Sequence, residues 1–415
     1  MGDRIILHSD FNNFYASVEC LFNPILRGKP VAVAGDVQER HGIVLAKNDL
    51  AKQHGVSTGD PLWLAHQKCP EIVFTPPHFD RYLRCAKTAQ DIYAQYTDQV
   101  ESYGLDECWM DVTGSTRLFG GGRQIANEIR CRIKSELGIT ASIGVSFNKV
   151  FAKLGSDMKK PDATTVIDRE HFKQVVWPLP ASDLLFVGRA TAARLARLGV
   201  HTIGQLAQTS QNTLKSILGK NGLMLWSFAN GHDTSPVSRQ GGRLLIKSVG
   251  NGTTAPRDLI SDQDIRITLY ILCESVAERL RENHFVAGTL QLGIRDSSLF
   301  SCVRQAPLPY RTASAQELFQ TAYGLCRRHH RAGAPIRSLH VRACNLSIQD
   351  SVQLSLLPEQ VAREKRDRLE EAVDGIRRRY GHFAVQRAVM LADPQLAKLD
   401  PRKDHAAHPE PFRKQ

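Results

Sequence analysis

Short apolar runs predict three strands in the first 150 residues of the chain. The first is R-I-I-L-H-S at residues 4–9. The second lies within residues 105–113, where every second residue after two adjacent acids is apolar, and the third is I-T-A-S-I-G-V at residues 139–145. Alternation of this kind places one face of a strand against a core.

Helical spacing of apolar residues predicts helices between these strands. Residues 81–96 and 125–137 fit amphipathic helices. A basic helix, F-N-K-V-F-A-K-L-G-S-D-M-K-K-P, follows the third strand and places Lys149 and Lys153 four residues apart on one face. Strands that alternate with helices in this way indicate a fold containing both α and β structure.

A smaller α/β part is predicted between the first strand and residue 77. It begins with the helix F-Y-A-S-V-E, for which Asn12 or Asn13 can serve as the N-cap. Two strands follow, at residues 30–34 and 42–46, and the helix A-K-N-D-L-A-K-Q-H-G-V then ends at its glycine.

The size and charge of the chain suggest a polyanionic partner. It has 415 residues, a formal charge of +12 and a pI near 9.3, and its length indicates about two to four domains. A basic excess favours binding to nucleic acid. No apolar run is long enough to span a bilayer, and the first residues lack the apolar segment of a secretory signal. We therefore expect a cytoplasmic protein with no membrane partner.

Cysteine and histidine spacing narrows the possible metal chemistry. The nine cysteines are dispersed without a C-x-x-C pair, and the fifteen histidines show no H-E-x-x-H spacing. Neither a zinc site nor a disulfide framework is indicated. Any metal should therefore have oxygen ligands, which favours magnesium or manganese.

Three acids are candidate metal ligands. Asp106 and Glu107 are adjacent in a turn that enters the second strand, and two neighbouring carboxylates repel each other unless a cation offsets their charge. Asp10 follows the first strand, at the kind of strand end where α/β sheets bind ligands. The alternatives are a solvated turn for the pair and a helix cap for Asp10.

Acids at strand ends beside a lysine-bearing helix form the arrangement that two-metal phosphoryl transfer requires. In that chemistry carboxylates hold two cations, one of which activates a hydroxyl while the other bridges a triphosphate. Lysines neutralise the leaving pyrophosphate, and no protein nucleophile is needed.

Three separated motifs resemble those of a known family. They are D-F-N-N-F-Y-A-S-V-E at residues 10–19, L-D-E-C-W-M-D-V-T at residues 105–113 and A-S-I-G-V-S-F-N-K-V-F-A-K-L-G-S-D-M-K-K-P at residues 141–161. In this order they resemble the motifs of Y-family translesion DNA polymerases, nearest the bacterial polymerase IV branch. The similarity runs from residue 5 to about residue 350.

The resemblance implies an α+β multidomain fold of the right-hand polymerase type. Its parts would be a ferredoxin-like palm, small fingers, a helical thumb with a helix-hairpin-helix, and an α/β little finger. We expect the palm at residues 1–11 and 78–168, the fingers at 12–77, the thumb at 169–239, a linker at 240–247, the little finger at 248–349 and a tail at 350–415.

The resemblance also implies the metal ligands. Asp10, Asp106 and Glu107 would be the catalytic acids and, with the main-chain carbonyl of Phe11, would bind two Mg²⁺ ions, with Mn²⁺ as a possible substitute. The serine that relatives place two residues before the acidic pair is Gly104 here.

Nucleotide contacts are implied at four positions. Tyr15, next to Phe14, would act as the steric gate that excludes the ribose 2′-hydroxyl; ordinary helix packing is the alternative. Lys160, just before the proline of the third motif, would contact the triphosphate, and Lys52 replaces an arginine that does so in relatives.

The helix at the triphosphate departs from the family pattern. A hydroxyl residue and a tyrosine of many relatives become Ala46 and Asp49, and an acid beside a triphosphate would repel it. Lys52 also lacks the bidentate geometry of arginine. Either Lys47, Asn48 and Lys52 rebuild the pocket or nucleotide affinity is weak.

Residues 169–237 include a pattern that resembles a helix-hairpin-helix, whose backbone N–H groups contact a DNA phosphate at helix N-termini. Phe186 stands where the family commonly has a glycine. DNA contacts are expected from Gly188, Arg189 and Gly199, and a purely structural helical bundle is the alternative.

The last predicted domain is basic. Residues 245–349 contain thirteen Lys and Arg against eight Asp and Glu, a net charge of +5, and arginines on a sheet face can follow backbone phosphates. DNA contacts are expected from Arg295, Arg304 and Arg342.

The end of the chain carries a separate motif. Residues 353–357, Q-L-S-L-L, resemble the peptide by which bacterial polymerases bind the sliding clamp, with Gln353, Leu354, Leu356 and Leu357 as contact residues. A charged helix follows, and residues 400–415 are expected to be disordered.

We therefore expect a monomeric DNA-directed DNA polymerase that acts on primer-template DNA and dNTPs, tolerates damaged templates and lacks a proofreading exonuclease. A non-catalytic accessory of translesion synthesis, which would keep the fold and the DNA grip, is the main alternative, but such proteins lack the acids that are present here. A nucleotide cyclase with a related palm is disfavoured by the helix-hairpin-helix and the clamp-like peptide.

Overall fold

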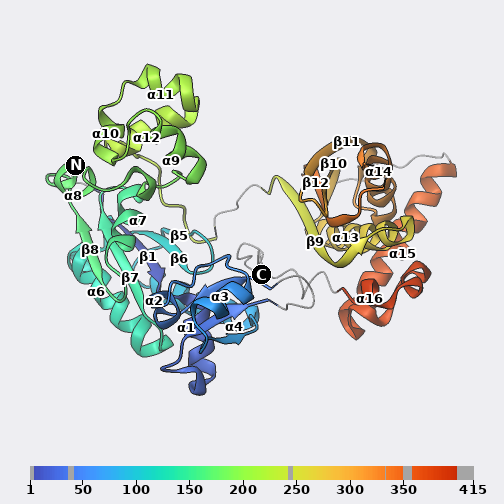
Figure 1. Ribbon diagram of the computed structural model, residues 1–415, viewed down its shortest axis with the longest axis horizontal. Helices are drawn as coiled ribbons and strands as arrows, with labels where there is room; N and C mark the ends of the chain where they lie inside the picture. The colour runs from blue at the N-terminus through green and yellow to red at the C-terminus, as the bar shows by residue number, and fades with distance from the viewer. Residues whose placement is uncertain (1–3, 36–41, 242–245, 332, 349–357, 400–415) are drawn as a thin grey trace. The chain divides into compact units, whose positions relative to one another are not determined.

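The computed structural model describes residues 4–35, 42–241, 246–331, 333–348 and 358–399. These residues form two compact units, which divide the chain at about residue 243. Each unit is built around its own sheet or sheets and has its own apolar core (Figure 1).

A five-stranded sheet is the centre of the first unit. Its strands are antiparallel neighbours except for the last two, which are parallel. All six residues of the middle strand are buried. In spatial order the strands are β5 (Val100–Ser102), β6 (Glu107–Asp111), β1 (Ile6–Phe11), β7 (Ala141–Ser146) and β8 (Thr164–Ile167).

Helices cover both faces of this sheet. α4 (Phe79–Tyr93) and α6 (Gly122–Arg132) pack on one face, where Leu7 lies in their shared core. α7 (Lys149–Met158) packs on β1, β7 and β8 from the other face. This approach is close because a Cβ atom on Gly144 of β7 would lie 1.9 Å from the carbonyl oxygen of Ala152. The glycine thereby brings the lysines of α7 near the sheet.

A three-stranded sheet forms a smaller part of the same unit. Its strand order is β3 (Val44–Lys47), β2 (Val31–Ala34) and β4 (Val73–Thr75). The helices near it are α1 (Phe14–Phe22), α2 (Asp49–Gln53) and α3 (Leu62–Lys68), with the 3₁₀ turn η1 (Pro24–Leu26). Sequence reasoning did not predict α3 and β4.

The capping prediction for α1 is confirmed for the position of the N-cap but not for its side-chain hydrogen bond. Asn13 stands at the N-cap with a left-handed backbone, φ 50°, and its side chain makes no capping hydrogen bond. The Asn12 side chain instead donates to the Ser142 hydroxyl at 3.0 Å and accepts from the backbone N–H of Asp162 at 2.9 Å. Asn12 thus connects β1 to the segment after α7.

Short helical elements complete the first unit. The glycine-rich stretch after β6 contains η2 (Thr113–Ser115) and α5 (Thr116–Phe119), and the helix before β7 ends in a π-helical turn, η3 (Ile133–Leu137). The helical region after β8 packs around a core that it shares with α7. It comprises α8 (Phe172–Val176), η4 (Ala181–Asp183), α9 (Arg189–Ala196), α10 (Ile203–Gln208), α11 (Gln211–Leu218) and α12 (Lys220–Ala229).

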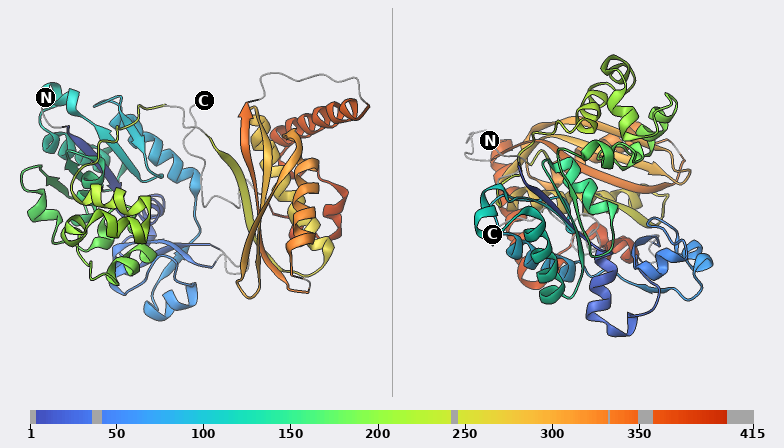
Figure 2. Two further views of the ribbon diagram at one scale, coloured as in Figure 1. Left: turned by 90° about the horizontal axis from the view of Figure 1, so that it is seen from above. Right: turned by 90° about the vertical axis from the view of Figure 1, so that its left-hand side faces the viewer.

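The second unit is an antiparallel four-stranded sheet with helices packed on one face (Figure 2). The strand order is β11 (Ser301–Thr312), β10 (Phe285–Asp296), β12 (Ile336–Ile348) and β9 (Ser248–Leu259). α13 (Asp262–Glu282) and α14 (Ala315–His329) cover the packed face. Sequence reasoning missed β9, whose glycines and Pro256 are unusual in a strand.

The chain after β12 is part of this unit. The predicted charged helix is α15 (Pro358–Tyr380), followed by η5 (His382–Ala384), η6 (Ala388–Ala392) and α16 (Pro394–Ala397). Met390 and Leu396 enter the core of the unit. Arg281 of α13 donates to Asp374 of α15 at 2.7 Å, so residues of the predicted tail add a layer over the helices.

Candidate active site

The strand register brings the predicted acids together at one end of β1 and β6. Asp10 pairs directly with Glu107 across these strands, and the backbone N–H of Phe11 donates to the carbonyl oxygen of Asp106 at 3.1 Å. Because side chains alternate along β1, Asp10 shares with His8 the face that α7 covers. Asp10 is 5% exposed.

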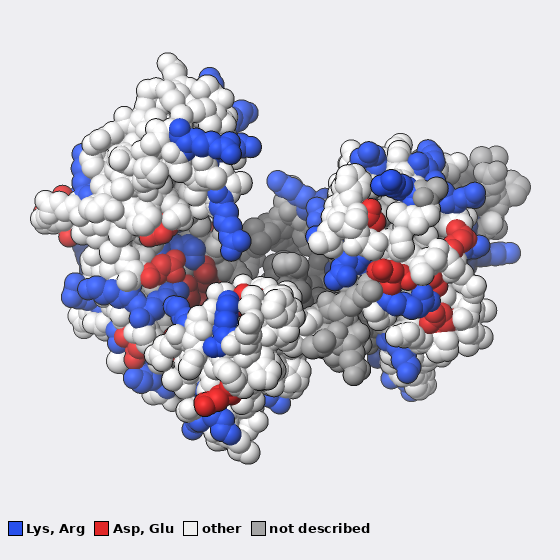
Figure 3. Space-filling view, viewed as in Figure 1, with Lys and Arg blue, Asp and Glu red and all other residues white. Residues whose placement is uncertain are grey.

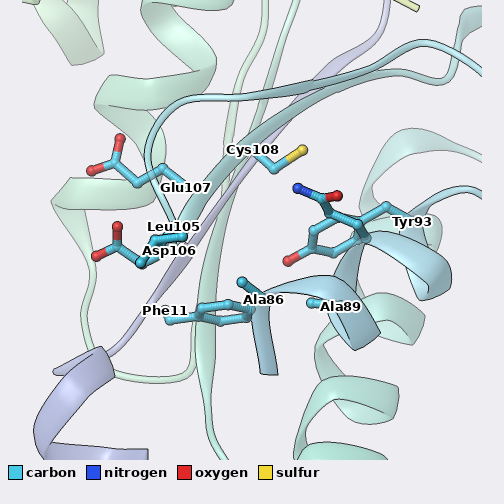
Figure 4. A pocket seen from close by; sticks show the side chains of 9 residues that line it. Phe11, Ala86, Ala89, Tyr93, Leu105, Asp106, Glu107 and Cys108 are labelled. Carbon is cyan, nitrogen blue, oxygen red and sulfur yellow. The ribbon is translucent and has the colours of Figure 1, made fainter. Parts of the chain in front are cut away.

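Asp106 and Glu107 project in the same direction. Figure 4 shows their carboxylates next to each other, pointing away from Tyr93 and Cys108, while the Phe11 ring lies on the floor of the adjoining small pocket. The turn before them favours a glycine because Gly104 has a left-handed backbone with a φ of 95°. The departure at Gly104 therefore has a local cause.

Two lysines from α7 and the segment after it contact the acids. Lys160 donates to Asp10 Oδ2 at 2.8 Å and lies 2.9 Å from Asp157. Lys153 donates to Glu107 Oε2 at 2.5 Å. Figure 3 shows acidic side chains gathered on the visible face of the first unit, with lysine and arginine side chains beside them.

Burial shifts the pKa values of these acids in different directions. Burial raises the pKa of Asp10 to about 7, because the loss of hydration outweighs the attraction of Lys160. Burial and then the neighbouring Glu107 raise the pKa of Asp106. Burial acts in the same sense on Glu107, but contacts with His8 and Lys153 outweigh it and lower its pKa.

The acids fit a divalent cation by chemistry. Their donors are all carboxylate oxygens, which hard cations prefer, and burial raises the pKa values of Asp10 and Asp106, so a nearby cation would stabilise their charged forms. In the part of the chain that the structure describes, no three His, Cys, Asp or Glu side chains gather closely enough to hold a metal. Lys160 and Lys153 form ion pairs with Asp10 and Glu107 in this structure.

Tyr15 lies in an aromatic group between α1 and α4. Its ring stacks on Tyr82, with centroids 4.3 Å apart and planes 12° apart. Phe79 meets it edge-on at 5.7 Å, and Phe14 lies 5.5 Å away. Burial is the main cause that raises the pKa of Tyr15 to about 12, and the charge of Asp106 raises it further. The ring therefore lies within electrostatic reach of the acids.

The side chains at the start of α2 and just before it differ in their contacts. The Asn48 side chain accepts from the backbone N–H groups of Ala51 and Val31 and donates to the Lys29 carbonyl, so both its oxygen and its nitrogen take part in local structure. Lys47 donates to Thr58 at 3.2 Å. Burial, and then the nearby charge of Lys52, lower the pKa of Lys47. Asp49 is exposed in the first turn of α2.

The predicted phosphate contacts of the helical region lie at turns. Gly188 is the N-cap of α9, Arg189 is its first residue, and Gly199 has a φ of 74° in the turn that follows the helix. Phe186 adopts a left-handed backbone, φ 69°, with its side chain 56% exposed. The phenylalanine therefore keeps the conformation that glycine would adopt.

The three predicted arginines of the second unit do not share a face. Arg342 pairs across strands with Gln291, which lies on the same side of β10 as Arg295. Arg304 instead pairs with Leu292, a buried residue of the helix-covered side. The expectation of one face bearing all three was wrong because the register of the edge strand β11 turns Arg304 to the other side.

Some expected features fall outside the described residues. Gln353, Leu354, Leu356 and Leu357 are among them, as are residues 400–415. Among the helices that the structure describes, none is long and apolar enough to cross a membrane.

Sequence reasoning overlooked His8 and the partners of Tyr15. His8 is fully buried, and its Nε2 lies 3.5 Å from Glu107 Oε2 without a hydrogen-bond partner. Its position two residues before Asp10 on a strand was a signal that both share a face. Glu19, one helical turn after Tyr15, was a comparable signal on α1.

Comparison with known proteins places this geometry in a family. Residues 9–157 match the impB/mucB/samB family, residues 246–356 match its C-terminal domain, and residues 182–233 match the thumb domain of DNA polymerase iota. The chain is 50% identical over 397 residues to DNA polymerase IV of Acetivibrio thermocellus, covering 95% of this chain and all of that protein. It is 36% identical to DNA polymerase IV 2 of Halalkalibacterium halodurans, covering 97% and 98% of the two chains.

A solved structure agrees in fold. A Y-family DNA polymerase chimera matches with a TM-score of 0.73 at 23% identity, over 83% of this chain and 99% of the other. The expected α+β right-hand polymerase architecture is thereby confirmed. The protein belongs to the Y-family DNA polymerases, in the branch of bacterial DNA polymerase IV.

Proposed function

We propose that this protein is a DNA-directed DNA polymerase in which Asp10, Asp106 and Glu107 bind divalent cations for nucleotidyl transfer from a dNTP to a primer 3′-hydroxyl. The observation that carries the proposal is the register of β1 and β6, which places three carboxylates at one sheet end. The raised pKa values of two of them supply the physical reason for a cation.

Mg²⁺ ions bound by these residues would act as Lewis acids on the 3′-hydroxyl and the triphosphate. The main-chain carbonyl of Phe11 is the expected additional ligand. The chain itself contributes orientation and charge. Lys160 and Lys153 hold the acids in place and must yield part of their contacts to the cations. No side chain is needed as a nucleophile.

The nucleotide is held by two sets of residues. Tyr15, backed by the Phe14 and Tyr82 rings, blocks the 2′ position of the sugar. Lys160 contacts the triphosphate from one side, and Lys47 and Lys52 form a positive pair on the small sheet and α2. Of the two alternatives for the altered fingers, we favour a rebuilt pocket, with Asn48 excluded because its polar atoms are used elsewhere.

DNA is bound through its backbone. We assign Gly188, Arg189 and Gly199 to phosphate contact at the N-terminus of α9 and the turn that follows it. On the second unit we assign Arg295 and Arg342, which lie on one sheet face, and leave out Arg304. His340, near both arginines, joins this face.

The wider assignments follow from the family. We propose low-fidelity, lesion-tolerant synthesis without proofreading, by a monomer located in the cytoplasm. We keep the palm, fingers, thumb and little finger at the boundaries expected from the sequence. We extend the little finger through residue 399, because α15 and α16 pack on its helices. Binding of the sliding clamp through residues 353–357 is also proposed.

Primer extension tests the proposal. Wild-type protein with Mg²⁺, primer-template and dNTPs should extend the primer, and the Asp106→Ala/Glu107→Ala variant should bind the same DNA without extending it. If the wild-type protein binds DNA and extends nothing, the accessory alternative is correct. If the double variant extends the primer at the wild-type rate, these acids are not the catalytic ligands.

A further inference from the structure

The ring of Tyr15 belongs to a closed circuit of contacts between α1 and α4, which is formed by Tyr15, Tyr82 and Glu19. Tyr15 and Glu19 lie four residues apart, on successive turns of α1. Tyr82 of α4 stacks on Tyr15 at 4.3 Å, and its hydroxyl donates to Glu19 Oε1 at 2.5 Å. The circuit therefore leaves α1 at Tyr15 and returns to it at Glu19.

The carboxylate of Glu19 lies in the interior of the first unit, where an unpaired charge would lower the stability of the fold. Glu19 is 1% exposed, and a buried carboxylate is destabilising unless hydrogen bonds and opposite charge compensate it. The first turn of α4 and the residue before it provide that compensation: Arg81 donates to Glu19 at 3.0 Å, and His78 Nδ1 lies 3.0 Å from both carboxylate oxygens. Three donors from one helix end thus converge on one acid.

The hydroxyl of Tyr82 is fixed as a donor in this circuit. Burial and then the hydrogen bond to Glu19 raise the pKa of Tyr82, so the phenol stays protonated. The Tyr82 side chain is held at both ends, by the backbone of α4 and by Glu19, and it is fully buried. Without the anchor at its hydroxyl end, the ring could slide or tilt along its stacked neighbour.

The position of the Tyr15 ring matters on a sub-ångström scale. A steric filter distinguishes a hydroxyl from a hydrogen at one carbon atom, and displacement of a positioning group by about 1 Å is enough to change rates by roughly 100-fold. Phe79 limits the ring at its edge, at 5.7 Å, but aromatic contacts alone permit lateral motion. The directional contact in the group is the Tyr82 hydroxyl on Glu19.

We propose that Glu19 is a positioning residue for sugar selection, which fixes the plane of the Tyr15 ring by anchoring Tyr82. This inference rests on the proposed function, in which Tyr15 is the steric gate. Glu19 contacts neither the nucleotide nor the cations in this account, so its loss should change the choice of sugar more than the rate with the correct nucleotide.

The experiment measures kcat/KM for a dNTP and for the matching rNTP on one primer-template. Tyr82→Phe removes only the anchoring hydroxyl, and Glu19→Gln keeps the size of the acceptor but removes its charge. Each should lower the ratio of dNTP to rNTP efficiency by about 10-fold, while the dNTP value stays within about 3-fold of wild type.

Tyr96→Phe is the matched control. Tyr96 also donates its hydroxyl to a carboxylate, Glu128 Oε1 at 2.7 Å, and belongs to the same apolar core, but it has no ring contact with Tyr15. This variant should leave the sugar ratio unchanged. If it relaxes selection as much as Tyr82→Phe, a general loosening of the core explains the effect and the inference is overturned.

Tyr15→Ala separates this inference from the gate itself. If Tyr15→Ala admits rNTPs while Tyr82→Phe and Glu19→Gln keep the wild-type ratio, Tyr15 is the gate but Glu19 does not position it. If Tyr15→Ala changes nothing, the gate and this inference both fail. In the supported case, Tyr15→Ala/Tyr82→Phe is no less selective than Tyr15→Ala alone, because the anchor acts only through the ring. Tyr82→Phe, the smaller change, decides the matter if Glu19→Gln does not fold.

Discussion

Two pairs of carboxylates, one in each unit of this protein, have pKa values that are shifted in opposite directions. In the first unit, Asp10 is buried and Asp106 is half-buried, each lies near another acid, and their pKa values are raised. In the second unit, Asp264 and Asp393 receive hydrogen bonds from Arg257 and from backbone N–H groups, and their pKa values are lowered. The first arrangement disfavours the charge that the residue carries, whereas the second stabilises it.

The direction of the pKa shift distinguishes the carboxylates of the proposed active site from those that hold the fold together. Charges that are satisfied within the fold, such as those joining α15 to α13 and the N-cap of α16 to β9, contribute to holding elements together. Charges that remain unfavourable persist only where a ligand completes them. The same residue types therefore form the proposed cation site in one unit and a structural network in the other.

The largest expected effect is on activity, from Asp10→Asn. This substitution should reduce the primer-extension rate by roughly 1,000-fold or more, because a ligand of the proposed cations is lost. In EDTA, the free energy of unfolding should stay the same or increase, because a desolvated charge is removed. A urea titration followed by fluorescence measures the second quantity. Retained activity would remove Asp10 from the site.

Arg281→Met should lower stability and leave activity unchanged, which is the reverse of the result expected for Asp10→Asn. Arg281 is a largely buried side chain that donates to Glu370, Asp374 and the carbonyl of Ala313. Removing it leaves both acids without their arginine partner, so the second unit should lose about 3 kcal/mol of stability, while the extension rate per folded molecule is preserved.

Arg266→Met is the control for that variant. Arg266 lies on the same helix, but its partner Asp262 is 4.0 Å away and both side chains are about half exposed. Its replacement should cost less than about 0.5 kcal/mol. Equal losses in the two variants would contradict the structural role given to the buried network.

Lys160→Ala should weaken nucleotide binding more than it lowers the rate of chemistry. Loss of one charge-assisted contact to the triphosphate predicts a KM for dNTP that is roughly 10-fold higher. Steady-state kinetics on a single template base gives both constants. Lys159→Ala, at the exposed neighbouring position, should leave KM near the wild-type value, and a similar rise in both variants would argue for general electrostatics.

The smallest expected effect is a difference in pH dependence. The pKa of Asp10 is raised in the folded state, so its contribution to stability is present below about pH 4 and is lost as the pH rises through about 7. The pKa of Asp264 is lowered, so its contribution is present above about pH 4 and is lost as the pH falls.

Asp10→Asn and Asp264→Asn test these signs when each is compared with wild type in EDTA from pH 3 to 8. Relative to its variant, the wild-type protein should lose stability with rising pH at Asp10 and with falling pH at Asp264. Slopes of the same sign at the two positions would contradict the comparison between the units.

Much of the fold followed from local patterns. Strand alternation around Cys108 and Met110 gave the correct buried face, and the acids could be placed at a strand end from sequence order alone. Side-chain packing and strand register could not be predicted from local patterns. Arg304 changed faces because pairing across strands sets its side, and β9 was hidden by its glycines.

The surroundings of the candidate site were also beyond the sequence. The contacts of Lys160 with Asp10 and of Tyr82 with Glu19 join residues that are 150 and 63 positions apart. The sequence shows each of these residue types but not which of them meet. For the same reason, the sequence did not show that Met390 and Leu396, which lie in the predicted tail, pack into the core of the second unit.

Binding of Mn²⁺ measures the central claim most directly. Electron paramagnetic resonance can count the ions held by protein mixed with dNTP and a primer that ends in a dideoxynucleotide. We expect wild-type protein to hold two Mn²⁺ ions in this complex, and Asp10→Asn to lose at least one of them while it still binds the DNA. Equal stoichiometry and affinity in the two proteins would contradict the assignment of the three acids as a cation site.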